Sequence, residues 1–173
     1  MLVGIMSDSH DNIPNVKKAL TVFRENKVKA VIHLGDIVSP FTLKELCSLE
    51  IPVYAVFGNN CGEKILLSQV ARECGVKLSH PPYQIELGEN RVRRILLLHG
   101  FGSKQQTVQL ARILAKSGEY DAILFGHTHE PLIEKHGNTI LLNPGEVLGY
   151  LTGKASIALL DLSTLEGRII YLD

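Results

Sequence analysis

The sequence has no excess of charge, no long apolar run and no Lys or Arg in its opening stretch, and each absence narrows the class of protein. Its 173 residues include 18 Lys or Arg and 18 Asp or Glu, so the formal net charge is zero. This balance argues against a protein that bulk charge holds to nucleic acid or to a membrane. No run of about 18 apolar residues exists, so no membrane span is expected. The opening stretch MLVGIMSDSH lacks a basic region and soon becomes polar, which indicates a core strand rather than a signal peptide.

Cysteine is also scarce. Cys47, Cys61 and Cys74 are odd in number, and they do not form a metal-binding pair. This usage favours a reducing compartment and predicts that the protein has no disulfide framework. The chain is therefore expected to be cytoplasmic.

The chain nevertheless has the composition of a globular protein. Hydrophobic residues make up 45% of it, which is enough for a sizeable core. The length predicts that residues 1–173 form a single domain. Strand-like and helix-like segments alternate in the first half, which predicts a parallel sheet there. The second half is richer in strands, which predicts a mixed sheet or a second packed sheet. The expected strands are 2–6, 28–34, 53–57, 83–87, 92–98, 122–125, 131–135, 139–142, 155–161 and 168–172.

Helices are expected to begin near residues 13, 40, 63 and 104. Ser39 before Pro40 suits an N-cap followed by proline in the first turn. Ser103 with Gln106 matches a capping box. Apolar residues recur at helical spacing on two of these segments: Val16, Ala19, Leu20 and Phe23 on the first, and Val108, Ala111, Leu114 and Ala115 on the last.

Polar side chains of metal-binding types follow five of the expected strands. In open α/β sheets, ligands bind at the carboxyl ends of the strands. Glycine adjoins the polar residue at four of these ends, which lets the backbone turn sharply or approach closely. One such strand end is a weak indication, but five in one chain predict a metal site. The ends read Asp8-Ser9-His10, Gly35-Asp36, Gly58-Asn59-Asn60, His99-Gly100 and Gly126-His127-Thr128-His129.

The two histidines of the last strand end allow two interpretations when they are taken alone. A Gly-His pair after a strand can be a turn with a hydrogen-bonded imidazole. Residues i and i+2 of an extended segment point to the same side, so His127 and His129 can also face one metal site. The other four strand ends favour metal binding. The remaining histidines, His33, His80 and His136, lie outside this pattern and are expected to be structural.

Mixed nitrogen and oxygen donors indicate which cation is expected. They suit Mn²⁺, Zn²⁺, Fe or Ni²⁺ better than Ca²⁺ or Mg²⁺ alone, with Mn²⁺ as the first expectation. Seven ligands exceed what one tetrahedral ion takes, so two cations bridged by Asp36 are predicted. With two carboxylates and a bridging hydroxide, two divalent cations keep a net charge of about +1, which would attract a phosphate ester. The candidate ligands are Asp8, His10, Asp36, Asn59, His99, His127 and His129.

The motifs DSH, GD, GNN, HG and GHTH, in this order, resemble those of the calcineurin-like metallophosphoesterase superfamily. Within it, the short chain and NPGE at 143–146 resemble the small YfcE-type phosphodiesterases of bacteria and archaea. The resemblance covers about residues 1–150. It implies a four-layer α/β/β/α sandwich with a di-metal site between loops. It also implies that one metal is held by Asp8, His10, Asp36 and His129, and the other by Asp36, Asn59, His99 and His127.

The implied activity is metal-dependent hydrolysis of a phosphate diester, in which a bridging hydroxide attacks phosphorus. Asp36, His10 and Asn60 are the residues assigned to catalysis. The third motif departs from the common G-N-H-[D/E], because Asn60 and Cys61 stand in its last two positions. The missing histidine normally contacts the phosphate and helps the leaving group. Asn60 donates a hydrogen bond but cannot release a proton at neutral pH, so poor leaving groups should react slowly.

Two other functions stay open at this point. The retromer subunit that resembles this family is a non-catalytic interaction scaffold, but a scaffold has no evident need for all seven ligands. A phosphomonoesterase is a third option, against which the missing histidine argues mildly. The expected partner is a phosphodiester, either a small molecule or a nucleotide, and no membrane; a homodimer is left open. No cap domain or long specificity loop is visible, so the pocket should be shallow and open.

Overall fold

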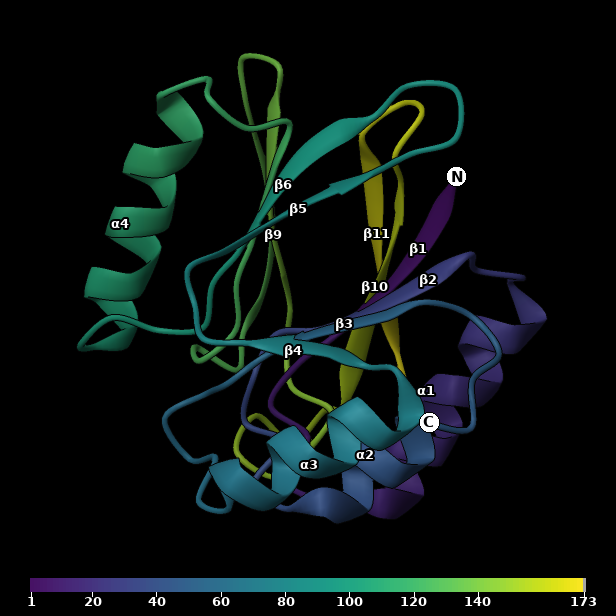
Figure 1. Ribbon diagram of the computed structural model, residues 1–173. Helices are drawn as coiled ribbons and strands as arrows, with labels where there is room; N and C mark the ends of the chain where they lie inside the picture. The colour runs from purple at the N-terminus through teal and green to yellow at the C-terminus, as the bar shows by residue number, and fades with distance from the viewer. Residues whose placement is uncertain (173) are drawn as a thin grey trace.

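Two β-sheets stack face to face, and helices cover both outer faces (Figure 1). The computed structural model describes residues 1–172. The expected four-layer α/β/β/α sandwich is confirmed. Its helices are α1 (Ile13–Glu25), α2 (Pro40–Leu46), α3 (Lys64–Cys74) and α4 (Lys104–Lys116). Its strands are β1 (Leu2–Met6), β2 (Ala30–His33), β3 (Val53–Val56), β4 (Lys77–Ser79), β5 (Tyr83–Leu87), β6 (Arg93–Leu97), β7 (Ala122–Leu124), β8 (Pro131–His136), β9 (Thr139–Pro144), β10 (Ser156–Asp161) and β11 (Glu166–Tyr171).

The order of the strands places the candidate ligands at one edge. The first sheet has the order β11-β10-β1-β2-β3-β4, and β1 to β4 run parallel. The second sheet has the order β5-β6-β7-β9-β8, with a parallel centre and antiparallel outer strands. Parallel neighbours end at the same edge of a sheet. The loops after β1, β2 and β3 therefore lie together, as do the loops after β6 and β7.

Three apolar layers hold the sandwich together. The inner layer joins the two sheets and includes Ile5, Ile32, Ile95 and Leu124. The helices α1, α2 and α3 cover the outer face of the first sheet, and α4 covers that of the second (Figure 1). The strands β1, β2 and β3 are covered on both faces, which is why their sequences are nearly continuous apolar runs. The predicted face of α1 is buried, with Val16, Ala19, Leu20 and Phe23 all inside.

The strand β4 was not expected from the sequence. It has only three residues and pairs with β3 at the edge of the first sheet, where Lys77 lies opposite Tyr54. Its side chains are exposed or half-buried. A strand this short cannot show the apolar alternation that identifies longer strands, so only its pairing with β3 defines it.

The prediction that the chain has no disulfide was wrong, because Cys47 and Cys74 form one. Cys47 directly follows α2, and Cys74 is the last residue of α3. These helices pack against each other on the same sheet, so their ends bring the two Cα atoms within 5.5 Å. A separation of 27 residues in the sequence carries no sign of this contact. Cys61 remains free and buried. The argument from cysteine usage for a reducing compartment therefore loses its support.

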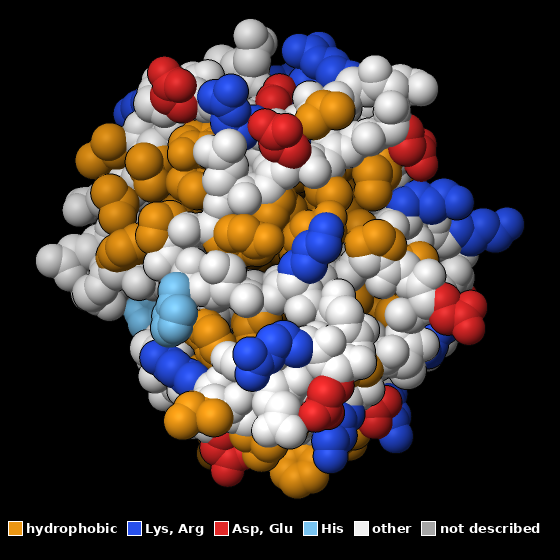
Figure 2. Space-filling view, viewed as in Figure 1, with side chains coloured by type: hydrophobic (Ala, Val, Ile, Leu, Met, Phe, Trp, Pro, Cys, Tyr) orange, Lys and Arg blue, Asp and Glu red, His pale blue; other side chains and the backbone are white. Residues whose placement is uncertain are grey.

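The face of the molecule in Figure 2 agrees with the balanced composition. On the face shown in Figure 2, Lys and Arg side chains are interspersed with Asp and Glu side chains. This face therefore carries no broad field of one sign.

Candidate metal centre

Backbone hydrogen bonds hold the loops that carry the candidate ligands side by side. The N–H groups of Asp8 and His10 donate to the carbonyls of Gly35 and Asp36, each at 3.0 Å. These bonds tie the loop after β1 to the loop after β2. The N–H of His127 donates to the Asp8 carboxylate at 3.0 Å, which ties in the loop after β7 from the second sheet. The site is thus built where the two sheets meet.

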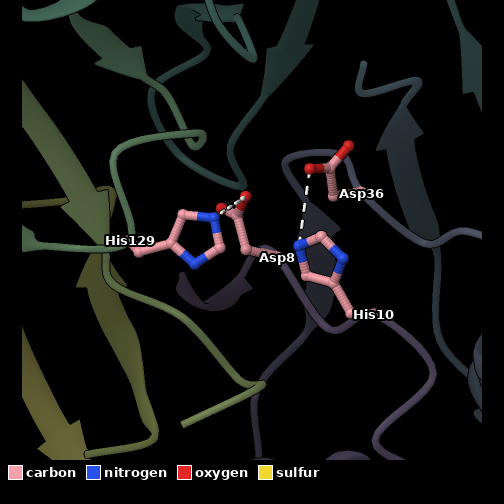
Figure 3. A group of neighbouring side chains, drawn as sticks. All are labelled: Asp8, His10, Asp36 and His129. Atoms are coloured by element: carbon pink, nitrogen blue, oxygen red, sulfur yellow. Dashed lines mark ion pairs between the residues drawn. The ribbon is translucent and has the colours of Figure 1, made fainter. Parts of the chain in front are cut away.

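Four of the candidate ligands form what we call the inner cluster: Asp8, His10, Asp36 and His129. One ligand atom from each lies within 4.8 Å of the others. The imidazole of His129 faces Asp8, with 3.4 Å between Nε2 and Oδ1, and that of His10 faces Asp36, with 3.5 Å between Nε2 and Oδ2 (Figure 3). Asp8, Asp36 and His129 are buried. Sequence reasoning thus named every member of this cluster.

The other candidates meet beside it in the outer cluster, which consists of Asp36, Asn59, His99 and His127. Asn59 Oδ1 lies 2.9 Å from both His99 Nε2 and His127 Nδ1. His99 Nε2 lies 3.4 Å from Asp36 Oδ1. Asp36 therefore presents one carboxylate oxygen to each cluster. The structure brings all seven candidate ligands together.

Two buried atoms of the inner cluster have no hydrogen-bond partner among residues 1–172. They are Asp8 Oδ1 and His10 Nε2. Leaving a buried polar atom unpaired is costly, so such atoms point to something that the protein chain does not itself supply. A carboxylate oxygen and an imidazole nitrogen are both good ligands for a divalent cation. The inner cluster therefore fits a metal ion.

The orientation of three imidazoles supports the same conclusion. An oxygen of a carbonyl or carboxylate can only accept, so the ring nitrogen that meets it carries the hydrogen. In a neutral imidazole the opposite nitrogen then turns a lone pair toward the clusters, where it meets other acceptor oxygens. Such partners orient the imidazoles of metal sites. The donations are from His99 Nδ1 to the Leu34 carbonyl at 2.7 Å, from His127 Nε2 to the Gly102 carbonyl at 3.2 Å, and from His129 Nδ1 to the Glu146 carboxylate at 2.7 Å.

Burial and neighbouring charges shift the pKa values of Asp8, Asp36 and His99. Burial raises the pKa of Asp8. Burial alone would also raise the pKa of Asp36, but contacts from His99 and Asn60 outweigh it and lower that pKa. Burial would lower the pKa of His99, but Asp36 and Asp8 outweigh it and raise that pKa. The two carboxylates thus favour a positive charge beside them, which a cation also provides.

The backbone is strained where the ligands lie. A positive φ is uncommon for residues other than glycine and persists where the surroundings enforce it, often at functional sites. The turns at the strand ends need this conformation to aim consecutive side chains into one small space. Five candidate ligands have it: Asp8 at 51°, His10 at 43°, Asp36 at 54°, His127 at 69° and His129 at 65°.

Two of the glycines beside the ligands are required by close approach. A Cβ atom on Gly58 would overlap the Asp36 carboxylate, and one on Gly100 would overlap the His127 imidazole. The expectation that these glycines permit close approach is confirmed.

Asn60 is exposed and contacts the shared carboxylate of Asp36. Its backbone N–H donates to Asp36 Oδ1 at 2.7 Å, and its side-chain amide donates to Oδ2 at 2.8 Å. Cys61, in the position of the usual acid, turns inward and accepts from the Gly58 N–H at 3.2 Å. The departure from the common third motif therefore places an amide donor, and no acid, beside Asp36.

The remaining histidines lie outside both clusters. His33 is buried beneath the site, where its ring contacts Ser9 at 3.0 Å and accepts from the Gly35 N–H at 3.3 Å. Burial lowers the pKa of His33 to about 3. His80 packs on Phe57, with 4.6 Å between the ring centroids. His136 lies on β8 and contacts Glu134 at 2.9 Å.

Sequence reasoning missed the part that NPGE plays in the site. The Asn143 amide donates to the Gly126 carbonyl at 3.1 Å and to the Thr128 hydroxyl at 3.0 Å, which holds the GHTH loop. Glu146 accepts from His129. Burial would raise the pKa of Glu146, but hydrogen bonds from His129 and Thr152 lower it. The motif itself was visible, but its contacts depend on how β9 packs beside β7.

The sequence and fold were also compared with known proteins. Residues 1–165 match the calcineurin-like phosphoesterase superfamily domain. Phosphodiesterase MJ0936 of Methanocaldococcus jannaschii is 37% identical over 174 residues, covering 100% of both chains. Phosphodiesterase YfcE of Escherichia coli is 27% identical over 156 residues, covering 85% of this chain and 79% of its own.

Solved structures agree with the sequence matches. The structure of an archaeal phosphodiesterase superposes with a TM-score of 0.86 at 36% identity, covering 99% of this chain and 100% of its own. Vps29 of Entamoeba histolytica, solved with Zn²⁺, superposes with a TM-score of 0.65 at 20% identity and covers 100% of both chains. At that identity it shows a shared fold alone.

Proposed function

This chain belongs to the calcineurin-like phosphoesterase superfamily, and on that premise we propose that it is a metal-dependent phosphodiesterase with a centre of two divalent cations. The observation that carries the proposal is that two buried atoms, Asp8 Oδ1 and His10 Nε2, have no hydrogen-bond partner within residues 1–172. These two atoms face His129 Nε2 and Asp36 Oδ2, at 3.4 and 3.5 Å respectively. The relatives named phosphodiesterases support a diester as the substrate.

The two clusters would each hold one cation. Asp8, His10, Asp36 and His129 would hold the first, and Asp36, Asn59, His99 and His127 the second. When bound, such a pair of cations neutralises phosphoryl oxygens and lowers the pKa of water so that it can attack phosphorus. Mixed nitrogen and oxygen donors suit Mn²⁺ first, with Ni²⁺, Zn²⁺ or Fe as alternatives.

In this proposal Asp36 and Asn60 have the main roles among the residues of the chain. Asp36 directs its two oxygens to different clusters, so it fixes the clusters relative to each other. Because Asn60 is exposed, its side-chain amide can donate a hydrogen bond to a phosphoryl oxygen of the substrate. It cannot give a proton to the leaving oxygen, so that proton would come from water. Diesters with activated leaving groups should therefore react best.

The wider setting belongs to the same proposal. Residues 1–173 would act as one domain, and the shared apolar layer between the sheets supports this. The substrate would be a small-molecule or nucleotide diester, a cytoplasmic location is retained as an expectation, and a homodimer stays open. Among the helices of residues 1–172, none is long and apolar enough to cross a membrane.

The test is an assay of aryl diesters and monoesters with Mn²⁺, Ni²⁺ and Zn²⁺ after complete removal of metal. We expect diester hydrolysis that depends on added metal and exceeds monoester hydrolysis. Anomalous scattering from crystals soaked in Mn²⁺ should give two peaks within about 4 Å. Faster monoester turnover would favour the phosphomonoesterase, and metal binding without any turnover would favour the scaffold. A single fully occupied peak would contradict the two-cation centre.

A further inference from the structure

Glu146 is a fully buried carboxylate that lies behind the inner cluster. Its Oε2 accepts from His129 Nδ1 at 2.7 Å. Its Oε1 accepts from both the backbone N–H and the hydroxyl of Thr152, each at 2.7 Å. Glu146 therefore contacts His129 through the ring nitrogen opposite to the one that faces Asp8.

The backbone around Glu146 is tied to the strand that carries Asp8. The N–H of Val147 donates to the Ser7 carbonyl and that of Leu148 to the Asp8 carbonyl, each at 3.0 Å. The Glu146 carbonyl accepts from the Ser156 N–H at 2.8 Å. Glu146 is thus held in place relative to Asp8, and through its side chain it holds His129 relative to Asp8 as well.

Among residues 1–172, no carboxylate takes this position behind an imidazole of the outer cluster. His99 and His127 donate to the neutral carbonyls of Leu34 and Gly102. A carboxylate behind an imidazole orients the ring and also makes its other nitrogen a stronger metal ligand. The two clusters therefore differ in burial and in the charge of the group behind their imidazoles, which is a carboxylate in the inner cluster and a neutral carbonyl in the outer one.

We propose that Glu146 is the positioning residue of the inner cluster, and that it sets the cation affinity of this cluster without affecting the outer one. Thr152 supports it by holding the second carboxylate oxygen. The inference rests on the proposed two-cation function, and it adds a residue that touches neither cation nor substrate.

Isothermal titration of the metal-free chain with Mn²⁺ tests the proposal. The parent should show two binding events. Glu146→Ala should weaken one of them by about 10- to 100-fold and leave the other within about 2-fold. Glu146→Gln should lie between, because its amide oxygen still accepts from His129 but carries no charge. Thr152→Val should give a smaller loss at the same event.

A surface pair provides the matched control. Glu134 also accepts from a histidine, His136, at 2.9 Å, but this pair lies on β8 away from both clusters. Glu134→Gln should leave both binding events unchanged. If Glu146→Ala does not fold, Glu146→Gln and Thr152→Val decide the question.

Crystals of Glu146→Gln at limiting Mn²⁺ identify the affected cluster. We expect the anomalous peak beside Asp8 and His129 to weaken and the peak beside His99 and His127 to remain. Equal loss at both clusters, or no loss at either, would overturn the role of Glu146 while leaving the two-cation function intact. A parent chain that binds no Mn²⁺ would overturn both.

Discussion

The inner and outer clusters share Asp36 but are held in different ways. In the inner cluster, Asp8 Oδ2 accepts from the Ser7 hydroxyl at 2.6 Å and from the His127 N–H at 3.0 Å, so groups outside the cluster or backbone atoms fix it. In the outer cluster, Asn59 is exposed, and its Oδ1 contacts the two imidazoles that would bind a cation with it. The inner cluster is therefore preorganised by the fold. In the outer cluster the Leu34 and Gly102 carbonyls orient the imidazoles, but Asn59 Oδ1 meets their lone-pair nitrogens, and a cation among these atoms would relieve that contact between acceptors.

Removing the shared carboxylate should have the largest effect. Asp36→Ala takes a ligand from both clusters, so we expect kcat/KM for an aryl diester to fall by about 10³-fold or more. Circular dichroism should show that the fold is retained. Glu119→Gln, an exposed carboxylate far from the clusters, is the control and should keep parental activity. Near-normal turnover by Asp36→Ala would show that this carboxylate does not join the clusters.

Replacing Asn60 should test whether a proton donor beside Asp36 helps the leaving group to depart. General acid catalysis contributes about 10²- to 10⁴-fold, and it matters most for basic leaving groups. Asn60→His should therefore raise kcat/KM of the poorest substituted phenyl diesters most, by about 10²-fold, and flatten the dependence on leaving-group pKa. Asn60→Gln changes the amide without adding an acid and should not flatten it. Parallel slopes for Asn60→His and the parent would place the acid elsewhere.

The two histidines of the GHTH loop allow a direct comparison of the clusters. His129→Ala removes the donor to the buried Glu146, so the metal-free protein should lose about 1–3 kcal/mol of unfolding free energy. His127→Ala acts on a half-buried ring and should cost less than about 1 kcal/mol. Both residues have positive φ, at 65° and 69°, so the backbone strain of alanine is matched. Urea unfolding in excess chelator measures both, and equal losses would contradict the contrast between the clusters.

Removing the cap of α4 should have the smallest effect, and this cap lies beside the outer cluster alone. The predicted capping box is confirmed: Ser103 Oγ accepts from the Gln106 N–H at 3.2 Å, and Gln106 Oε1 accepts from the Ser103 N–H at 2.8 Å. Ser103 follows Gly102, whose carbonyl orients His127. Ser103→Ala should cost about 1 kcal/mol of stability. Ser68→Ala, inside α3, should cost nothing because alanine has the higher helix propensity. Equal stability of the two variants would show that the cap contributes little.

Much of the fold followed from local patterns. Apolar runs that are buried on both faces predicted β1, β2 and β3, and helical spacing predicted the face of α1. The short strand β4 was not predicted, because three residues are too few to show an alternation of apolar and polar side chains. The seven candidate ligands were found because each follows a strand, and the parallel order of those strands brings their ends together. Whether all seven bind cations stays a prediction.

The sequence by itself determined the residue types at the strand ends, the balance of charge and the glycines that let backbone approach ligand. These are properties of short segments, so local physics suffices for them. Only the tertiary structure decided the Cys47–Cys74 disulfide, the support of His129 by Glu146 and the division into an inner and an outer cluster. Each depends on contacts across long separations in the sequence, such as the separation of 119 between Asp8 and His127. Such contacts exist only once the two sheets have packed against each other, and no local pattern encodes their distance.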